Sequence, residues 1–144
     1  MRIKLDEGAF MPTRAYPSDA GLDLYAREMK VIPARGSAKF DTGVHIELPL
    51  VTIGDKAFYT VGMLKSKSGL NVKHGITSEG VIDYSYRGSI VAKLYNNTDE
   101  DYVVERGHKI TQLVILPILN ECCMVFDELT EGARGNNGFG SSGV

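Results

Sequence analysis

The chain has 144 residues, of which 43% are hydrophobic and 24% charged, and its net charge at pH 7 is −2. This length and composition are those of a single globular domain with a real core, and the slight negative charge argues against a broad basic surface for nucleic acid or an anionic membrane. Because no apolar run approaches the ~20 residues of a membrane span and the first residues do not resemble a signal peptide, we expect a cytoplasmic protein with no membrane partner and no nucleic-acid partner.

Short predicted strands, broken by turns, follow one another along the chain. Residues 44–48 and 89–95 alternate apolar and polar side chains, which is typical of half-buried strands. Residues 58–61 and 112–116 are rich in β-forming residues and indicate more buried strands. One helical turn is predicted, over residues 68–72. The sequence therefore predicts an all-β barrel or sandwich with at most one short helix.

Two segments in the first half of the chain could carry chemistry. Asp23 lies inside the apolar strand of residues 20–26, where a buried carboxylate needs a partner, a metal-bound water or a raised pKa. A backbone-satisfied aspartate at a strand end is the alternative. Residues 66–70, Ser-Lys-Ser-Gly-Leu, combine hydroxyls, an ammonium group and a glycine, which could form a phosphate-binding loop. Polar loops of this composition are common, so this signal is weak alone.

Two further segments follow in the second half. Glycines at both ends of residues 80–88 permit a tight hairpin that would bring Asp83 and Tyr86 together. A carboxylate beside an aromatic face suits the activation of water next to a sugar ring. For an isolated pair of this kind, however, an aspartate that merely caps the turn is the commoner case. Residues 106–114 predict a turn that leads into a core strand, with Gln112 at its polar-to-apolar junction.

The end of the chain, residues 134–144, is rich in glycine and serine. Glycines can turn backbone N–H groups toward an anion, Arg134 can bind phosphate and Phe139 can stack on a base. A disordered terminus is the alternative. Residues 138–143 match Gly-x-Gly-x-x-Gly, but the chain stops one residue later, so no helix can follow as a dinucleotide site requires.

Histidines and cysteines do not indicate a catalytic or metal centre. The three histidines are scattered without metal-ligand spacing, and none is marked as the base for a serine or cysteine nucleophile. Cys122 and Cys123 are adjacent, and adjacent cysteines rarely form a disulfide or a zinc site. We therefore expect them to be reduced thiols in the core.

In their order and spacing, the five segments resemble the five motifs of the trimeric dUTPase family, from Ala20 to Gly143. The most diagnostic are Gly-Val-Ile-Asp-x-x-Tyr-Arg-Gly at 80–88 and Arg-Gly-x-x-Gly-Phe-Gly-Ser-Ser-Gly at 134–143. The resemblance implies a jelly-roll-type β-barrel over residues 1–130 and a glycine-rich C-terminal arm, residues 131–144, that closes over the active site. It also implies a homotrimer with shared active sites at the subunit interfaces.

The resemblance further implies that dUTP is hydrolysed to dUMP and pyrophosphate, with Mg2+ held mainly by the triphosphate. Asp83 would orient and deprotonate the water that attacks the α-phosphate in line, and Asp23 would reach the metal through water. Tyr86 would lie under the deoxyribose, Arg134 would hold the γ-phosphate and Phe139 would close over the uracil. The residues implied to contact the substrate are Lys67, Ser68, Gly69, Tyr86, Gln112, Arg134, Phe139, Gly140 and Ser141.

Three positions depart from the family pattern: Lys67 replaces the usual arginine, Ser85 an aspartate and His108 another aspartate. Lysine keeps the charge but loses the bidentate geometry of arginine.

Two alternative functions remain. A dCTP deaminase of the same fold would need a glutamate as proton shuttle, and only Glu79 is near the right place. A nucleotide-controlled regulator would bind a protein partner over the active-site mouth, if the chain is of phage origin.

Overall fold

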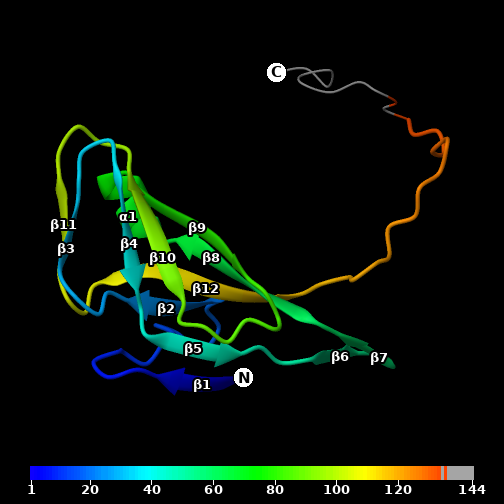
Figure 1. Cartoon of the computed structure of the whole chain (residues 1–144), viewed down its shortest axis with the longest axis horizontal. Helices are drawn as coiled ribbons and strands as arrows, with labels where there is room; N and C mark the ends of the chain where they lie inside the picture. Colours follow the sequence, from blue (N-terminus) through cyan, green and yellow to red (C-terminus); the bar gives the residue numbers. More distant parts are fainter. Residues whose placement is uncertain (134, 136–144) are drawn as a thin grey trace.

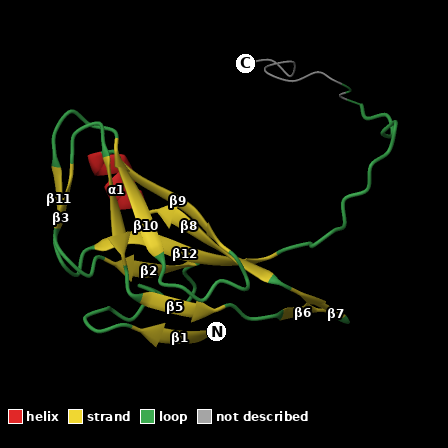
Figure 2. Ribbon diagram, viewed as in Figure 1, coloured by secondary structure: helices red, strands yellow, loops and turns green. Residues whose placement is uncertain are grey.

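The computed structural model describes residues 1–133 and 135. Strands dominate this part of the chain, with one short helix (Figure 2), which confirms the predicted fold class. In chain order the elements are β1 (Arg2–Leu5), β2 (Gly21–Tyr25), β3 (Lys30–Ile32), β4 (Ser37–Asp41), β5 (Val44–Glu47), β6 (Val51–Ile53), β7 (Lys56–Phe58), β8 (Thr60–Ser66), α1 (Ser68–His74), β9 (Ile76–Ile82), β10 (Val91–Asn96), β11 (Tyr102–Val104) and β12 (Lys109–Pro117).

The main sheet is antiparallel and has six strands, in the order β2-β12-β8-β9-β10-β4. Three two-stranded ladders, β1–β5, β3–β11 and β6–β7, complete the described part. In Figure 1 the β1–β5 pair lies below the main sheet, and the β3–β11 and β6–β7 pairs stand at opposite ends of the molecule. Strand β12, near the end of the described chain, pairs with both β2 and β8.

The core lies between the main sheet and the β1–β5 pair. It contains Val44 and Ile46 from β5 together with Leu64, Leu94 and Leu113 from the sheet. Buried and more exposed residues alternate along β5 and β10, as the period-two patterns predict. The predicted strand over residues 58–61 is broken, because β7 ends before and β8 begins after Tyr59. Among the described residues, every buried side-chain nitrogen and oxygen has a hydrogen-bond partner.

Helix α1 confirms the predicted helical turn and extends it to His74. Gly75 caps its C-terminal end with a φ of 62°, a left-handed conformation that glycine adopts without strain. The Gly75 N–H donates to the carbonyl of Asn71 at 2.9 Å. Lys73 and His74 lie in the last turn, where positive charge is favourable. The helix follows directly on β8 and places Ser68 and Gly69 at the end of that strand. No described helix is long and apolar enough to cross a membrane.

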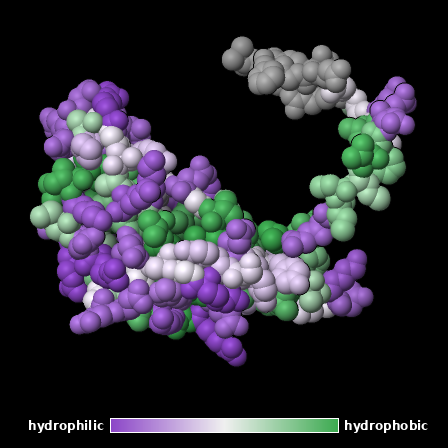
Figure 3. All heavy atoms as spheres, viewed as in Figure 1, coloured by the Kyte–Doolittle hydropathy of each residue, from purple (hydrophilic) through white to green (hydrophobic). Residues whose placement is uncertain are grey.

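Beyond Pro117 the chain leaves the sheet and runs outward (Figure 1). Figure 3 shows apolar atoms along this outgoing segment, away from the body of the molecule. Its exposed apolar side chains are Leu119, Met124, Val125, Phe126 and Leu129. The prediction that Cys122 and Cys123 are core thiols is wrong: both are exposed, because they belong to this segment and not to a strand of the barrel.

Candidate active site

Four polar side chains form a row across the main sheet. Gln112 on β12 is paired in register with Asp23 on β2 and with Lys65 on β8, and Lys65 is paired with Glu79 on β9. Residues directly opposite one another in an antiparallel sheet project from the same face. The fold therefore places residues from three of the predicted motifs, near 23, 66–70 and 112, on one face.

Asp23 is the electrostatic centre of this face. It is only 4% exposed. Lys67 Nζ lies 2.5 Å from its Oδ1, and Lys109 Nζ lies 2.8 Å from its Oδ2. Burial tends to raise the pKa of Asp23, but the hydrogen bonds and charges of Lys109 and Lys67 outweigh it and hold this pKa below its usual value. Asp23 is therefore a carboxylate between two ammonium groups.

Gln112 completes a group that we call the lysine cluster: Asp23, Lys67, Lys109 and Gln112. The Gln112 Nε2 donates to the backbone carbonyl of Ser66 at 3.0 Å. Gly21 makes room for this side chain, since a Cβ at Gly21 would lie 2.6 Å from Gln112 Oε1. The cluster sits next to the exposed Ser68 and Gly69 at the start of α1. Lysine and amide N–H groups beside an open helix start can bind phosphate oxygens.

Asp83 and Tyr86 lie together in a turn, which we call the 83–88 hairpin. The Tyr86 N–H donates to the Asp83 carbonyl at 3.0 Å, and the Tyr86 hydroxyl donates to the Ser89 carbonyl at 3.0 Å. Gly88 lets the aromatic ring fold against the backbone, because a Cβ there would lie 2.5 Å from Tyr86 Cζ. The turn thus places the backbone of Asp83 next to Tyr86 and holds the Tyr86 ring against Gly88 and Ser89.

The Asp83 carboxylate faces an open cavity of about 520 Å3. Asp83 is exposed, and within the described residues its side chain makes no hydrogen bond or ion pair. The rings of Tyr59 and Tyr84 meet edge to face with centroids 4.7 Å apart and form one wall. The residues that line the cavity are Tyr59, Asp83, Tyr84, Ser85, Ile118 and Asn120. A carboxylate without a counter-charge, open to solvent, is available to accept a proton from water.

Within one chain the hairpin and the lysine cluster lie apart. Asp83 follows β9 and lies four residues beyond Glu79, which is about 13 Å in the direction of the strand. Strand β9 is also three strand spacings, or about 14 Å, from β2 across the sheet. The structure therefore brings Asp23, Lys67 and Gln112 together, and Asp83 and Tyr86 together, as two separate groups.

Sequence reasoning missed Lys109 and Tyr59. Lys109 stands at the start of β12, and it meets the buried Asp23 because β12 pairs with β2, a pairing that no local sequence pattern indicates. Tyr59 gave no signal either. The predicted substrate contacts Arg134, Phe139, Gly140 and Ser141 lie outside the described residues.

Three further groups bear on the alternatives. Glu79 pairs with Lys65 at 2.9 Å, and the hydrogen bond and charge of Lys65 lower the pKa of Glu79. His108 lies in an exposed turn, where its Nδ1 accepts the N–H of Glu105 at 3.2 Å. In the part of the chain that the structure covers, no three His, Cys, Asp or Glu side chains gather as metal ligands would.

Comparisons with known proteins agree over almost the full length. The model of the dUTPase family matches residues 7–143. The deoxyuridine 5'-triphosphate nucleotidohydrolase of Clostridium acetobutylicum is 42% identical over 144 residues, which cover 98% of this chain and 94% of that protein. The corresponding protein of Paramecium bursaria Chlorella virus 1 is 39% identical over 142 residues, which cover 98% of this chain and 95% of that protein.

Solved structures show the same fold. The dUTPase of Staphylococcus bacteriophage 80alpha with dUpNHpp superposes with a TM-score of 0.87 at 29% identity, over 99% of this chain and 98% of that one. A dUTPase variant from phage phi11 of S. aureus, described with a structural Mg(II) ion, gives a TM-score of 0.77 at 26% identity, over 88% of this chain and 96% of that one.

Proposed function

Since the chain belongs to the dUTPase family, we propose that it hydrolyses dUTP to dUMP and pyrophosphate. One structural observation supports this activity above the others: Asp83 is exposed at a cavity, its side chain has no counter-charge among the described residues, and the 83–88 hairpin holds its backbone next to that of Tyr86. This is the arrangement that a base for water needs next to a sugar.

In the proposed mechanism, Asp83 orients a water molecule and takes its proton as the water attacks the α-phosphate in line with the leaving pyrophosphate. Such a reaction depends mainly on positioning and on stabilisation of charge. Tyr86 lies under the deoxyribose and leaves no room for a ribose 2′-hydroxyl. Its ring is held in place by Gly88 and by the hydrogen bond to Ser89, which supports a rigid sugar site.

Phosphate oxygens are proposed to bind at the lysine cluster, with Lys67 and Gln112, and at Ser68 and Gly69. Asp23 would reach a magnesium ion through water. The residues fit such an ion: Asp23 is ionised, and carboxylate oxygens that accept one lysine each keep lone pairs for a metal-bound water. Magnesium is commonly held by one or two carboxylates together with substrate phosphates, where it neutralises their charge.

We also propose a homotrimer with shared active sites, in which the hairpin of one subunit faces the lysine cluster of another. The distance between these groups within one chain supports this arrangement. The exposed apolar residues beyond Pro117 support it as well, because so many large apolar side chains are rarely left in water. Residues 131–144 would form the arm that closes over the site, with Arg134, Phe139, Gly140 and Ser141 on the substrate.

Light scattering tests the trimer. The intact chain should have three times the 15.7 kDa mass of one chain. A chain that ends at Ile118 should form an assembly of fewer than three subunits, because it lacks the exposed apolar segment. A trimer of unchanged stability after truncation would mean that another surface holds the subunits together.

The two alternatives fare differently. Glu79 pairs with Lys65 and does not line the cavity at Asp83, which disfavours a role as proton shuttle in a dCTP deaminase. Phage dUTPases of 80alpha are described as controlling the transfer of virulence genes by a G protein-like mechanism. A regulatory partner of this chain stays a prediction, and a pull-down in the presence of a dUTP analogue would test it. Binding unaffected by the analogue would contradict a partner surface over the active-site mouth.

The main experiment measures pyrophosphate release with magnesium from dUTP, dCTP, dTTP and UTP, in the wild type and in Asp83→Asn. Selective turnover of dUTP that is lost in the variant would support both the activity and the base. Binding of dUTP without hydrolysis would favour the regulator, and a uracil nucleotide formed from dCTP would favour the deaminase. Full activity in Asp83→Asn would refute the role of Asp83.

A further inference from the structure

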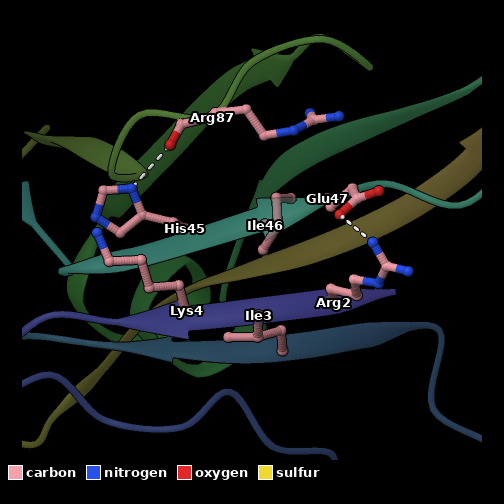
Figure 4. Close-up of a pocket in the computed structure, with 7 residues that line it drawn as sticks. All are labelled: Arg2, Ile3, Lys4, His45, Ile46, Glu47 and Arg87. Atoms are coloured by element: carbon pink, nitrogen blue, oxygen red, sulfur yellow. Dashed lines mark hydrogen bonds and ion pairs between the residues drawn. The ribbon is translucent and has the colours of Figure 1, made fainter.

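The 83–88 hairpin is attached to β5 through His45. Nδ1 of His45 lies 2.8 Å from the carbonyl oxygen of Arg87 (Figure 4). Its Nε2 lies 3.1 Å from Oδ1 of Asp6. The His45 side chain is only 20% exposed. Both ring nitrogens are therefore engaged, each with an oxygen from a different segment of the chain.

Both of these oxygens are acceptors. A backbone carbonyl carries no proton, and the Asp6 carboxylate lies between His45 and Arg27, whose Nη1 is 3.6 Å from its Oδ2. A neutral imidazole has one N–H donor and one lone pair, whereas an imidazolium has two donors. Only the protonated ring can donate to Arg87 and Asp6 together. The neutral ring would turn a lone pair toward one of the two oxygens.

The contact with His45 matters for the whole hairpin because Arg87 also binds its other carbonyls. The Arg87 guanidinium donates to the carbonyls of Tyr84 at 2.7 Å and Tyr86 at 2.9 Å. The hairpin is thus an internally linked unit, and the Arg87 carbonyl is one point at which it is tied to β5. A shift of Arg87 would therefore move Tyr86 and would change the position of Asp83.

We propose that His45 is a positioning residue for the hydrolysis: its imidazolium holds the 83–88 hairpin in place, and turnover falls when the ring loses its proton. The proposal rests on the proposed function, because it assigns Asp83 and Tyr86 to the reaction. His45 itself does not touch the cavity that Asp83 lines, so its effect is exerted through Arg87.

The charges around His45 favour the protonated ring. Asp6 faces it from the turn after β1, and Asp41 on β4 adds a second negative charge. Lys4, its register partner on β1, opposes protonation (Figure 4). Arg87 lines a pocket together with Lys4 and His45, but its guanidinium points away from the His45 ring (Figure 4), and Arg27 pairs with both Asp6 and Asp41.

The pKa of His45 is raised above its ordinary value, first by the hydrogen bond to the Arg87 carbonyl and then by Asp6. For a histidine whose pKa is raised on folding, the contribution is complete below the ordinary pKa of about 6.5 and is lost as the pH rises through the folded value. The alkaline side of the activity profile should therefore contain a fall that belongs to His45.

The test is the pH dependence of kcat and KM for dUTP with magnesium, in the wild type, His45→Gln, Asp6→Asn and the control His74→Gln. We expect His45→Gln to lower kcat about tenfold at the acid end and to lose the alkaline fall, since displacement of a positioned group costs one to two orders of magnitude. Asp6→Asn should move the fall to lower pH, and His74→Gln should leave the profile unchanged.

In the kinetics, either of two results would overturn the proposal: an unchanged alkaline fall in His45→Gln, or an unmoved fall in Asp6→Asn. Asp6→Asn keeps both the His45 ring and the Arg87 carbonyl that it contacts. This variant therefore remains informative if His45→Gln folds poorly. NMR titration of the wild type separates this proposal from the proposed function. The Arg87 and Gly88 amide shifts should follow the His45 ring with one midpoint, whatever the substrate proves to be. If the Arg87 and Gly88 amide shifts do not change with the protonation of His45, the contact between His45 and the hairpin is refuted.

Discussion

The two ammonium groups beside Asp23 allow a quantitative test of the lysine cluster. Lys67→Met and Lys109→Met each remove one of them and leave the carboxylate one counter-charge, so we expect a small loss of stability from either. The double variant leaves a carboxylate that is 4% exposed with no counter-charge in the described residues. An uncompensated buried charge costs about 3–5 kcal/mol, so the double loss should exceed the sum of the single losses.

The pH dependence of this loss has a defined sign. In the wild type the pKa of Asp23 is lowered, so its contribution is present above the unfolded pKa and is lost as the pH falls through the folded value. In the double variant only burial remains, which raises this pKa, and protonation then removes the penalty. The stability difference between the wild type and the double variant should therefore shrink as the pH falls from 7 to about 4.

Urea unfolding followed by circular dichroism measures these differences, at a fixed chain concentration because the stability of an oligomer depends on it. Lys65→Met is the matched control: it removes an ammonium from the exposed pair with Glu79 and should change little. Additive losses in the double variant, or a difference that does not change with pH, would refute the reasoning about Asp23.

Three further predictions concern packing, specificity and the metal. Gly62→Ala should lower the unfolding free energy by about 1–3 kcal/mol in urea titration, because its Cβ would lie 2.8 Å from Leu113 Cδ1 and 3.1 Å from Ile82 Cβ. Gly88→Ala should displace the Tyr86 ring, and we expect the preference for dUTP over UTP in kcat/KM to fall about tenfold. Removal of magnesium with EDTA should abolish turnover but leave the thermal midpoint of the free protein unchanged; a lower midpoint would indicate a metal held by the protein alone.

Local features of the sequence were sufficient to predict the fold class and the 83–88 hairpin. Period-two alternation marks β5 and β10 because one face of each is buried, and paired glycines mark the turn that joins Asp83 to Tyr86. Helix α1 was also predictable, although its C-terminal end depends on Gly75. The family resemblance then supplied the fold type and the substrate, which no local pattern contains.

Long-range pairing could not be predicted from the same patterns. Nothing local indicates that Lys67 and Lys109, far apart in the chain, meet at Asp23. The order of the motifs along the sequence likewise does not reveal that Asp83 lies away from the lysine cluster. For Cys122 the adjacency to another cysteine argued against a disulfide but carried no information about burial, which depends on where the chain leaves the sheet.

The position of β12 has a consequence for how the chain folds. This strand is the last in the described sequence, yet it lies inside the main sheet between β2 and β8. During synthesis β2 and β8 must wait with open edges until β12 leaves the ribosome, and such long-range pairing is slow. The main sheet should therefore be completed only after β12 has been synthesised, and chains truncated before Lys109 should expose two strand edges and aggregate.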